Sequence, residues 1–167
     1  LAGRIDNLSC CFVGMKGLIE GEGGSSTSIL VCNDHEEPGN TSTVGAAGDF
    51  LKTVLKRICG CGENYARAIS QSYLISSDNA HAEHPAFPDA HDGNHAPVLD
   101  GGPVIKVNSN QKYATTSETA ALFKLMCQKA KVPVQAFVSN NNSRCGGTIG
   151  PVTSTVIGVR TVDVGLP

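Results

Sequence analysis

Apolar residues occur along the chain in two patterns, and each pattern predicts one kind of secondary structure. In residues 5–19 and 44–58 they return at every third or fourth position, which is the spacing of an amphipathic helix. Asp6 and Asn7 stand where the first of these helices would be N-capped. Further helices are predicted at residues 63–71, from Ser117 onward, and between the last two apolar runs. The short apolar runs, typical of buried strands, are residues 28–32, 73–76, 103–107, 134–138 and 159–164.

Strands that alternate with helices in this way are typical of a layered α/β domain with a mostly parallel or mixed sheet. No internal repeat, low-complexity tract or linker interrupts the order, so we expect one domain or most of one. The chain does not begin with Met. We therefore expect it to be a piece of a longer protein.

Composition and charge exclude several classes of protein. The chain has 167 residues, of which 17% are charged, and a formal net charge of −2, which does not indicate electrostatic binding of nucleic acid. No apolar run approaches the ~18 residues of a membrane span. The seven cysteines are scattered, which suits a reducing cytosol better than a disulfide scaffold. Cys59 and Cys61 are interpreted as ordinary thiols.

Residues 78–102 form a long polar segment that contains four of the five histidines, and such loops inside compact domains are usually functional. Two acidic groups follow predicted strands, residues 34–37 and Asp78, at the edge where α/β sheets bind ligands. Carboxylate and imidazole are ligands for zinc, manganese or cobalt. A solvated loop or a turn explains the same residues, and Asp78, His81 and His84 alone would make a single-metal module. These patterns alone indicate a metallohydrolase.

Five segments resemble the M18 aminopeptidases of the aspartyl-aminopeptidase type, in the order found in that family and closest to its bacterial members. They are GRIDNL at 3–8, DHEE at 34–37, SDNAHAEHP at 77–85, GPVIKVNSNQKYA at 102–114 and CGGTIGP at 145–151. The resemblance extends over all 167 residues.

This resemblance implies a role for each matched residue of a site with two zinc ions, for which Mn²⁺ or Co²⁺ are alternatives. Asp6 matches the carboxylate that bridges both metals. Asp78 matches a ligand of one metal and Glu37 a ligand of the other. Glu36 matches the catalytic carboxylate, which would take a proton from the metal-activated water and pass it to the leaving amine.

Three further matches imply contacts with the substrate, a peptide with a free N-terminus. They are His81, Lys106 and Tyr113. Lys106 would pair with an acidic side chain, which favours removal of N-terminal Asp or Glu. Each has a structural alternative: Lys106 as a surface charge on an edge strand, and Tyr113 as core packing. His84, His91 and His95 are expected to organise the loop.

The resemblance also implies the setting of these residues. The fold would be a three-layer αβα sandwich of the zinc-peptidase, phosphorylase/hydrolase-like type, and the protein would be cytoplasmic and dodecameric. Residues 1–167 would be the central and C-terminal part of the catalytic domain. We expect its N-terminal portion, the dimerisation domain and the last catalytic segment, with two histidine ligands, to lie outside this chain.

This chain departs from the family pattern at Pro38, which follows Glu37 and restricts the backbone of that residue. Glu37 is therefore the least secure of the three ligands. Because the two histidine ligands and the dimerisation domain are expected to lie outside it, the chain alone is expected to be inactive. A non-catalytic fragment or subunit of the same fold is the alternative to an aminopeptidase.

Overall fold

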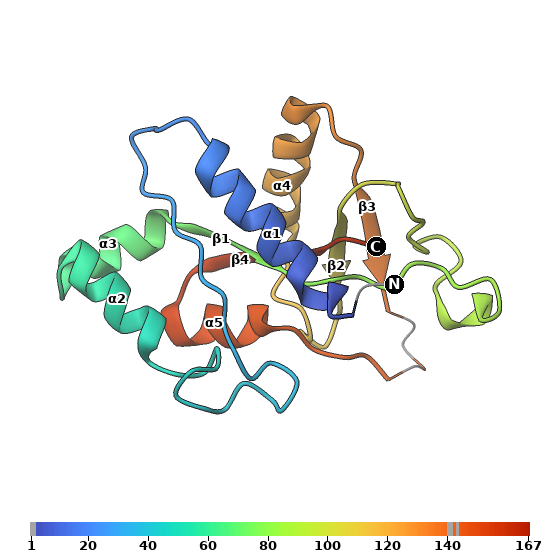
Figure 1. The fold of residues 1–167 in the computed structure, drawn as a ribbon, viewed down its shortest axis with the longest axis horizontal. Coiled ribbons are helices and arrows are strands. Elements are labelled where there is room, and N and C mark those ends of the chain that lie inside the picture. The colour runs from blue at the N-terminus through green and yellow to red at the C-terminus, as the bar shows by residue number, and fades with distance from the viewer. Residues whose placement is uncertain (1–2, 140–141, 143) are drawn as a thin grey trace.

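A computed structural model of the chain describes residues 3–139, 142 and 144–167. Helices and strands alternate along it, as the sequence predicts (Figure 1). In chain order they are α1 Ile5–Glu20, α2 Phe50–Cys59, α3 Glu63–Gln71, β1 Tyr73–Ser77, the 3₁₀ helix Pro88–Ala90, β2 Val104–Val107, α4 Ser117–Ala130, β3 Gln135–Val138, α5 Ile149–Ile157 and β4 Arg160–Gly165.

The described strands form one mixed sheet in the order β1-β4-β2-β3. β1 runs parallel to β4, and β2 runs parallel to β3. The two pairs meet in antiparallel orientation, with Val104 opposite Gly165 and Ile105 opposite Val164. The predicted α/β class with a mixed sheet is confirmed, and β2 and β4 are its interior strands.

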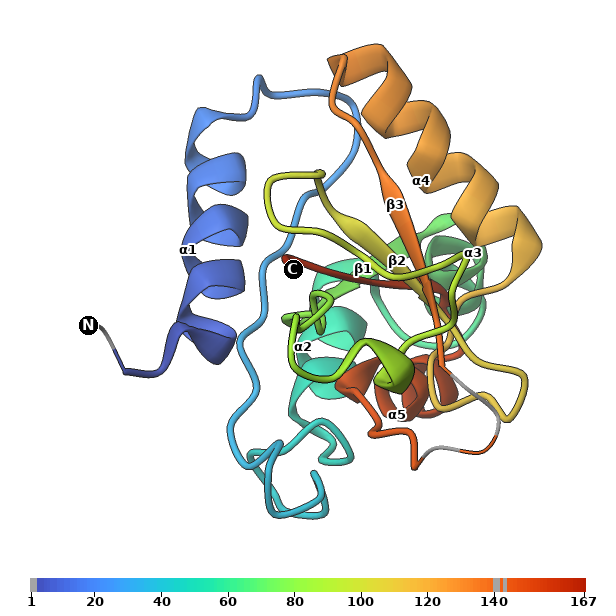
Figure 2. The same cartoon turned by 90° about the vertical axis from the view of Figure 1, so that its right-hand side faces the viewer.

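Side-chain alternation along the strands gives each face of the sheet its own helical layer. On one face, Val162 and Val164 form a core cluster with Ile105, against which Phe123 of α4 packs. On the other face Leu74 packs against the Ile69, Ile157 and Val159 cluster. Figure 2 shows α4 on one side of the sheet and α5 with α2 toward the other. This arrangement is the expected αβα sandwich.

Local sequence explains where the well-ordered helices begin and end. Thr116 accepts a hydrogen bond from the backbone N–H of Thr119 at 3.2 Å, while the Thr119 hydroxyl accepts one from the Thr116 N–H at 2.9 Å. This reciprocal capping box starts α4 at Ser117, as predicted. Gly158 ends α5 in the left-handed conformation, with φ 82°, before β4 begins.

Three sequence predictions about the first fifty residues are wrong. Residues 28–32 are not a strand, because their apolar run lies outside the four-stranded sheet. The helix predicted over residues 44–58 begins only at Phe50. Before it the chain turns so tightly that a Cβ atom at Gly45 would lie 2.3 Å from the Asn40 carbonyl oxygen. The N-cap of α1 is Arg4, and no side chain caps it.

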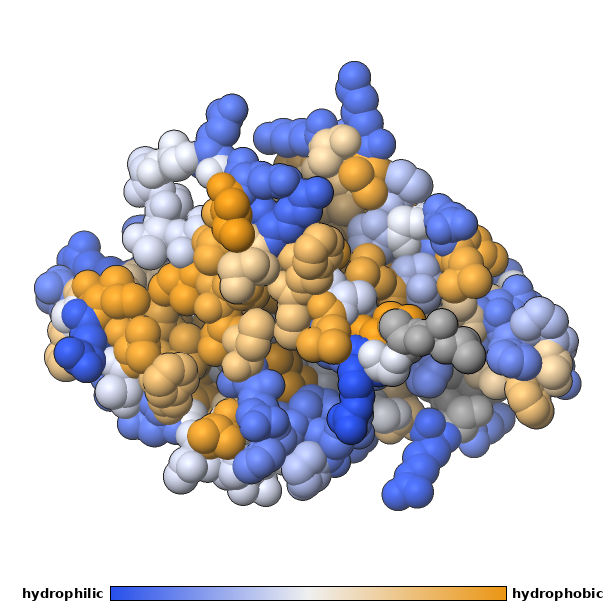
Figure 3. Space-filling view, viewed as in Figure 1, coloured by the Kyte–Doolittle hydropathy of each residue, from blue (hydrophilic) through white to orange (hydrophobic). Residues whose placement is uncertain are grey.

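The apolar residues of α1 lie largely on the molecular surface. Phe12 is 67% exposed and Ile19 is 74% exposed, and the apolar surface over α1 is continuous in Figure 3. The helix stands at the periphery, on the side of the sheet away from α4 (Figure 2). In the described part of the chain, no helix has the length and apolar character that a membrane span requires.

Candidate metal and active centre

The chain that leaves β1 runs close beside the end of β4 and carries the first site residue. The backbone N–H groups of Asp78 and Ala80 donate to the carbonyl oxygens of Val164 and Leu166, at 3.1 and 2.8 Å. A Cβ atom at Gly165 would lie 2.2 Å from the Asp78 carbonyl oxygen, so only glycine allows this approach. Asp78 is therefore held at the carboxyl edge of two parallel strands, where α/β sheets bind ligands.

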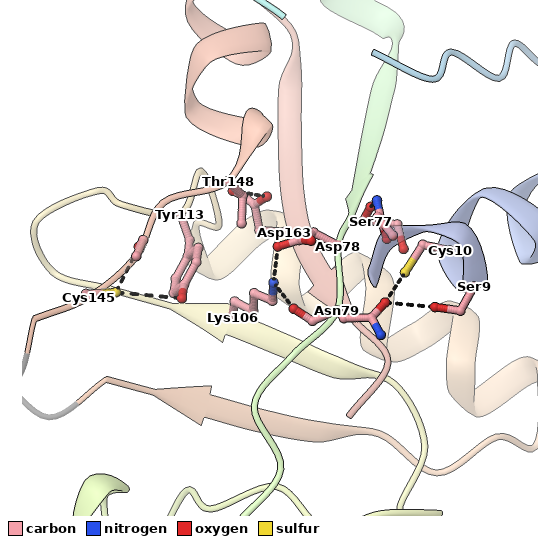
Figure 4. A network of polar contacts seen from close by, with 12 residues as sticks. Ser9, Cys10, Ser77, Asp78, Asn79, Lys106, Tyr113, Cys145, Thr148 and Asp163 are labelled. Carbon is pink, nitrogen blue, oxygen red and sulfur yellow. Dashed lines mark hydrogen bonds and ion pairs between the residues drawn. The ribbon is translucent and has the colours of Figure 1, made fainter. Parts of the chain in front are cut away.

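Lys106 projects from β2 into the same place and is almost completely buried. Its Nζ donates to Oδ2 of Asp78 at 2.9 Å and to the carbonyl oxygen of Asn79 at 2.7 Å (Figure 4). The Lys106 side chain is 4% exposed and that of Asp78 is 25% exposed. The surface-charge alternative for Lys106 is wrong, because β2 is an interior strand and a buried ammonium needs a partner.

The side chain of Tyr113 packs next to this ion pair. Its ring packs with Val104 and Phe137, and Nζ of Lys106 lies 5.6 Å from the ring centroid, within range of a cation–π interaction. The Cys145 thiol donates to the Tyr113 hydroxyl at 3.6 Å. Burial, reinforced by the contact with Cys145, raises the pKa of Tyr113 well above its usual range. The ring therefore packs in the core and the phenol stays protonated.

Asp163 of β4 is a buried charge that the sequence analysis did not single out. Its side chain is fully buried and accepts hydrogen bonds from the Thr148 hydroxyl at 2.7 Å and from the Ala114 backbone N–H. The Asp163 backbone N–H in turn donates to the Thr115 hydroxyl at 3.0 Å. These bonds tie the segment that carries Tyr113 to the sheet and to the start of α5. The only signal in the sequence is a carboxylate within an apolar run.

The first turn of α1 is fastened to the end of β1 by polar side chains. Asn7 donates to the Ser77 carbonyl oxygen at 3.0 Å. Asn79 accepts from the Ser9 hydroxyl at 2.9 Å and from the Cys10 thiol at 3.2 Å (Figure 4). These bonds bring Asp6 close enough to Asp78 for the charges of the two carboxyl groups to interact. Desolvation, followed by the charge of Asp78, raises the pKa of Asp6.

The acidic loop that follows residues 28–32 adds two more carboxylates. It turns at residues 36–39, where the Gly39 N–H donates to the Glu36 carbonyl oxygen at 2.9 Å. Glu36 is half-buried and Glu37 is exposed. Desolvation raises the pKa of Glu36, and the charges of Asp78, Glu37 and Asp6 raise it further, in that order. Lys106 is the cation that opposes this effect.

The histidines lie outside this group of side chains. His81 is exposed, three residues beyond Asp78. The Ala86 N–H donates to Nδ1 of His84 at 3.1 Å, and Nδ1 of His95 lies 2.6 Å from Oδ1 of Asp92. The ring of His91 packs edge-on against Phe137. His84, His91 and His95 thus organise the loop, as expected.

The donor chemistry of the carboxylates suits a divalent cation, although a complete ligand shell is not formed. Among residues 3–139, 142 and 144–167, no three His, Cys, Asp or Glu side chains converge as a metal site. Desolvation and then the charge of neighbouring carboxylates nevertheless raise the pKa of Asp6 and of Glu36. Carboxylate oxygens are suitable zinc ligands, and Asp6 and Asp78 are electrostatic neighbours.

An αβα sandwich with such carboxylates at the edge of its sheet suits a metal-dependent enzyme, and the reaction has to be assigned from the family. The sequence model of one family, described as aminopeptidase I zinc metalloprotease (M18), matches residues 1–167. The chain therefore belongs to the M18 aminopeptidase family, and the resemblance noted from the sequence is confirmed.

Curated relatives and solved structures of the family agree with this assignment. The chain is 54% identical to the probable M18 family aminopeptidase 2 of Pseudomonas paraeruginosa over 164 residues, 98% of this chain and 38% of that protein. It is 55% identical to the same protein of Stutzerimonas stutzeri, again over 98% of this chain and 38% of that protein. The chain thus spans well under half the length of these relatives.

Among solved structures, the cryo-EM structure of the Ape4 and Nbr1 complex matches with a TM-score of 0.88 and 40% identity, over 97% of this chain and 33% of that one. The structure of the mApe1 dodecamer of S. cerevisiae matches with a TM-score of 0.82 and 28% identity, over 97% of this chain and 38% of that one.

Proposed function

We propose that the protein is a zinc aminopeptidase that removes acidic residues, Asp or Glu, from the N-terminus of peptides. The observation that carries this proposal is the buried Lys106–Asp78 ion pair at the ends of β1 and β4, with Asp6 and Glu36 as electrostatic neighbours of Asp78. It occurs in a chain whose curated relatives are named M18 family aminopeptidases.

In this proposal Asp6, Asp78 and Glu37 would hold the two zinc ions, with Asp6 as the ligand common to both. Zinc, for which manganese or cobalt could substitute, would supply an activated water and polarise the scissile carbonyl. The raised pKa of Asp6 supports this assignment, because a carboxylate crowded by like charge gains most from a cation.

Glu36 is the general base. Its raised pKa brings it nearer to neutrality, where a carboxylate takes up and releases a proton most effectively. It would accept the proton of the attacking water and then donate it to the nitrogen of the leaving amine. Its half-buried position, next to but distinct from Asp6 and Asp78, supports this role.

Lys106 provides the preference for acidic residues. In the described structure its ammonium is paired with Asp78, the residue assigned to a metal. When Asp78 binds a cation, Lys106 loses that partner and needs another anion, because a buried ammonium without one is costly. The carboxylate of an N-terminal Asp or Glu is such an anion. His81 and the Tyr113 hydroxyl would contact the remainder of the substrate.

The proposal includes the assembly and location of the protein. The S. cerevisiae relative is described as a dodecamer, which supports a homo-oligomer here and a dodecamer in particular. The large exposed apolar surface of α1 is compatible with an assembly that covers more of the chain. The scattered free cysteines support a cytoplasmic location.

The test compares Asp6→Asn with Asp34→Asn, a neighbour of the acidic loop whose side chain accepts only from the His35 backbone in the described contacts. Zinc content and hydrolysis of Asp-, Glu- and Leu-arylamides are measured on the full-length protein. We expect Asp6→Asn to lose zinc and activity while Asp34→Asn keeps both, with acidic arylamides preferred.

Each other result selects a different function. Zinc binding that survives Asp6→Asn supports the single-metal module on Asp78, His81 and His84. Bound zinc without hydrolysis in the unmutated protein supports a non-catalytic member of the fold. Faster hydrolysis of Leu-arylamide would remove the acidic preference and leave the aminopeptidase in place.

A further inference from the structure

The segment that precedes the acidic loop lies against α1 and brings two cysteines together. A Cβ atom at Gly14 would lie 2.9 Å from Cδ1 of Leu30, so helix and segment are in contact there. Cys11 is one helical turn before Gly14, and Cys32 is two residues after Leu30. Figure 2 shows this segment passing between α1 and the sheet.

This register makes the two thiols neighbours, with Cys11 and Cys32 on the facing sides of helix and segment. The interaction with Cys32 is, after burial, the next cause that raises the pKa of Cys11. Cys32 is exposed and Cys11 is half-buried. The neighbouring Cys10 is buried, and its thiol donates in another direction, to Oδ1 of Asn79 (Figure 4). Of these three cysteines, Cys11 and Cys32 are the two that have access to solvent.

We propose that Cys11 and Cys32 form a reversible disulfide when the protein meets a low-molecular-weight disulfide such as oxidised glutathione. The exposed Cys32 thiolate attacks one sulfur of the glutathione disulfide, which expels one glutathione thiolate and leaves a mixed disulfide on Cys32. The Cys11 thiolate then attacks the Cys32 sulfur and expels the second glutathione. Two protein thiols are thereby oxidised by two electrons, and one glutathione disulfide is reduced to two thiols.

The bridge would join two segments that both lead to the carboxylates. Cys11 lies in the helix whose first turn carries Asp6, and Cys32 lies four residues before Glu36. No strand pairing holds residues 27–33 among the described residues. A covalent link there would limit the motion of this segment relative to α1. The proposal does not depend on the aminopeptidase function, because it concerns thiol chemistry alone.

The test treats the protein with oxidised glutathione and maps disulfides under non-reducing conditions by mass spectrometry, with titration of thiols in denaturant. We expect the thiol count to fall by two and the cross-link to join the peptides of Cys11 and Cys32. Backbone hydrogen exchange within residues 27–33 should slow on oxidation. Dithiothreitol should restore the thiols and the faster exchange.

Variants distinguish this pair from its neighbours. Cys11→Ala and Cys32→Ser should abolish the cross-link, whereas Cys10→Ala should preserve it, which settles the choice between the adjacent cysteines. Cys61→Ser, at another exposed cysteine, is the matched control and should leave the cross-link intact. Circular dichroism confirms that each variant is folded. A cross-link that survives Cys11→Ala, or glutathione that remains on Cys32 without a bridge, would overturn the proposal.

Discussion

Two regions supply the candidate site, and their carboxylates differ in burial and in the partners of their charge. The sheet region contributes Asp78, Lys106 and Asp163, whose charges meet an oppositely charged group or hydrogen-bond donors at close range. The outer region, α1 with the acidic loop, contributes Asp6, Glu36 and Glu37, which have mainly each other and Asp78 as electrostatic neighbours.

Apolar packing follows the same division. Val104 and Val162 of the sheet are 0% exposed, while Phe12 of α1 is 67% exposed. The polar groups of the sheet region are therefore part of a packed core. The carboxylates of the outer region have little cationic charge near them, and its apolar side chains are exposed. Under the proposed function, this is the surface that would bind the cation and further protein.

The largest effect is expected where the sheet region loses its buried carboxylate. Asp163→Ala leaves the Thr148 hydroxyl and the Ala114 N–H without their acceptor, and each buried unpaired donor costs about 1–3 kcal/mol. We expect a loss of about 3 kcal/mol in the free energy of unfolding, measured by urea titration with circular dichroism. Asp89→Ala, at an exposed aspartate, is the control. A loss below about 1 kcal/mol would show that the hydrogen bonds to Asp163 contribute little to stability, and the contrast between the two regions would then fail.

A smaller loss is expected from Lys106→Met, which removes the ammonium and keeps most of the apolar stem. Breaking a fully buried ion pair costs about 3–5 kcal/mol, and the partial exposure of Asp78 reduces this to about 2 kcal/mol. Lys112→Met, on an exposed residue nearby, should change stability little. In the double variant Asp78→Asn and Lys106→Met part of the loss should return, and strictly additive losses would contradict the pairing.

The smallest effect is expected in the outer region and has the opposite sign. A carboxyl with a raised folded-state pKa favours folding below its ordinary pKa, about 4.3 for Glu, and this contribution is lost as the pH rises through the raised value. Glu36→Gln should therefore stabilise the metal-free chain by about 0.5 kcal/mol at pH 7, a figure reduced for partial exposure.

The gain from Glu36→Gln should disappear near pH 4, where the wild-type carboxyl is largely protonated in both states. Glu22→Gln, at an exposed position after α1, serves as the control. Urea titrations at both pH values with a chelator present measure the difference. A Glu36→Gln variant that is less stable than the wild type at pH 7 would mean that a cation or a hydrogen-bond donor stabilises the Glu36 carboxylate.

Elements with strong local signals were predictable. The apolar runs at β1, β2, β3 and β4 were identified within one or two residues, because each strand supplies apolar side chains to a core cluster. Residues 28–32 have the same composition but find no partner strand, and a strand needs one to form. The late start of α2 likewise depends on close turns that only the folded chain reveals.

The sequence by itself determined the family, the layered α/β class and the identity of the carboxylates, because these depend on residue type, order and spacing. Tertiary structure alone decided that Lys106 is a buried partner of Asp78, that Asp163 organises the segment of Tyr113, and that Cys11 meets Cys32. Such contacts join residues 21 to 49 positions apart in the chain, the separations from Cys11 to Cys32 and from Ala114 to Asp163. No local pattern encodes a distance that arises only when strands and helices pack together.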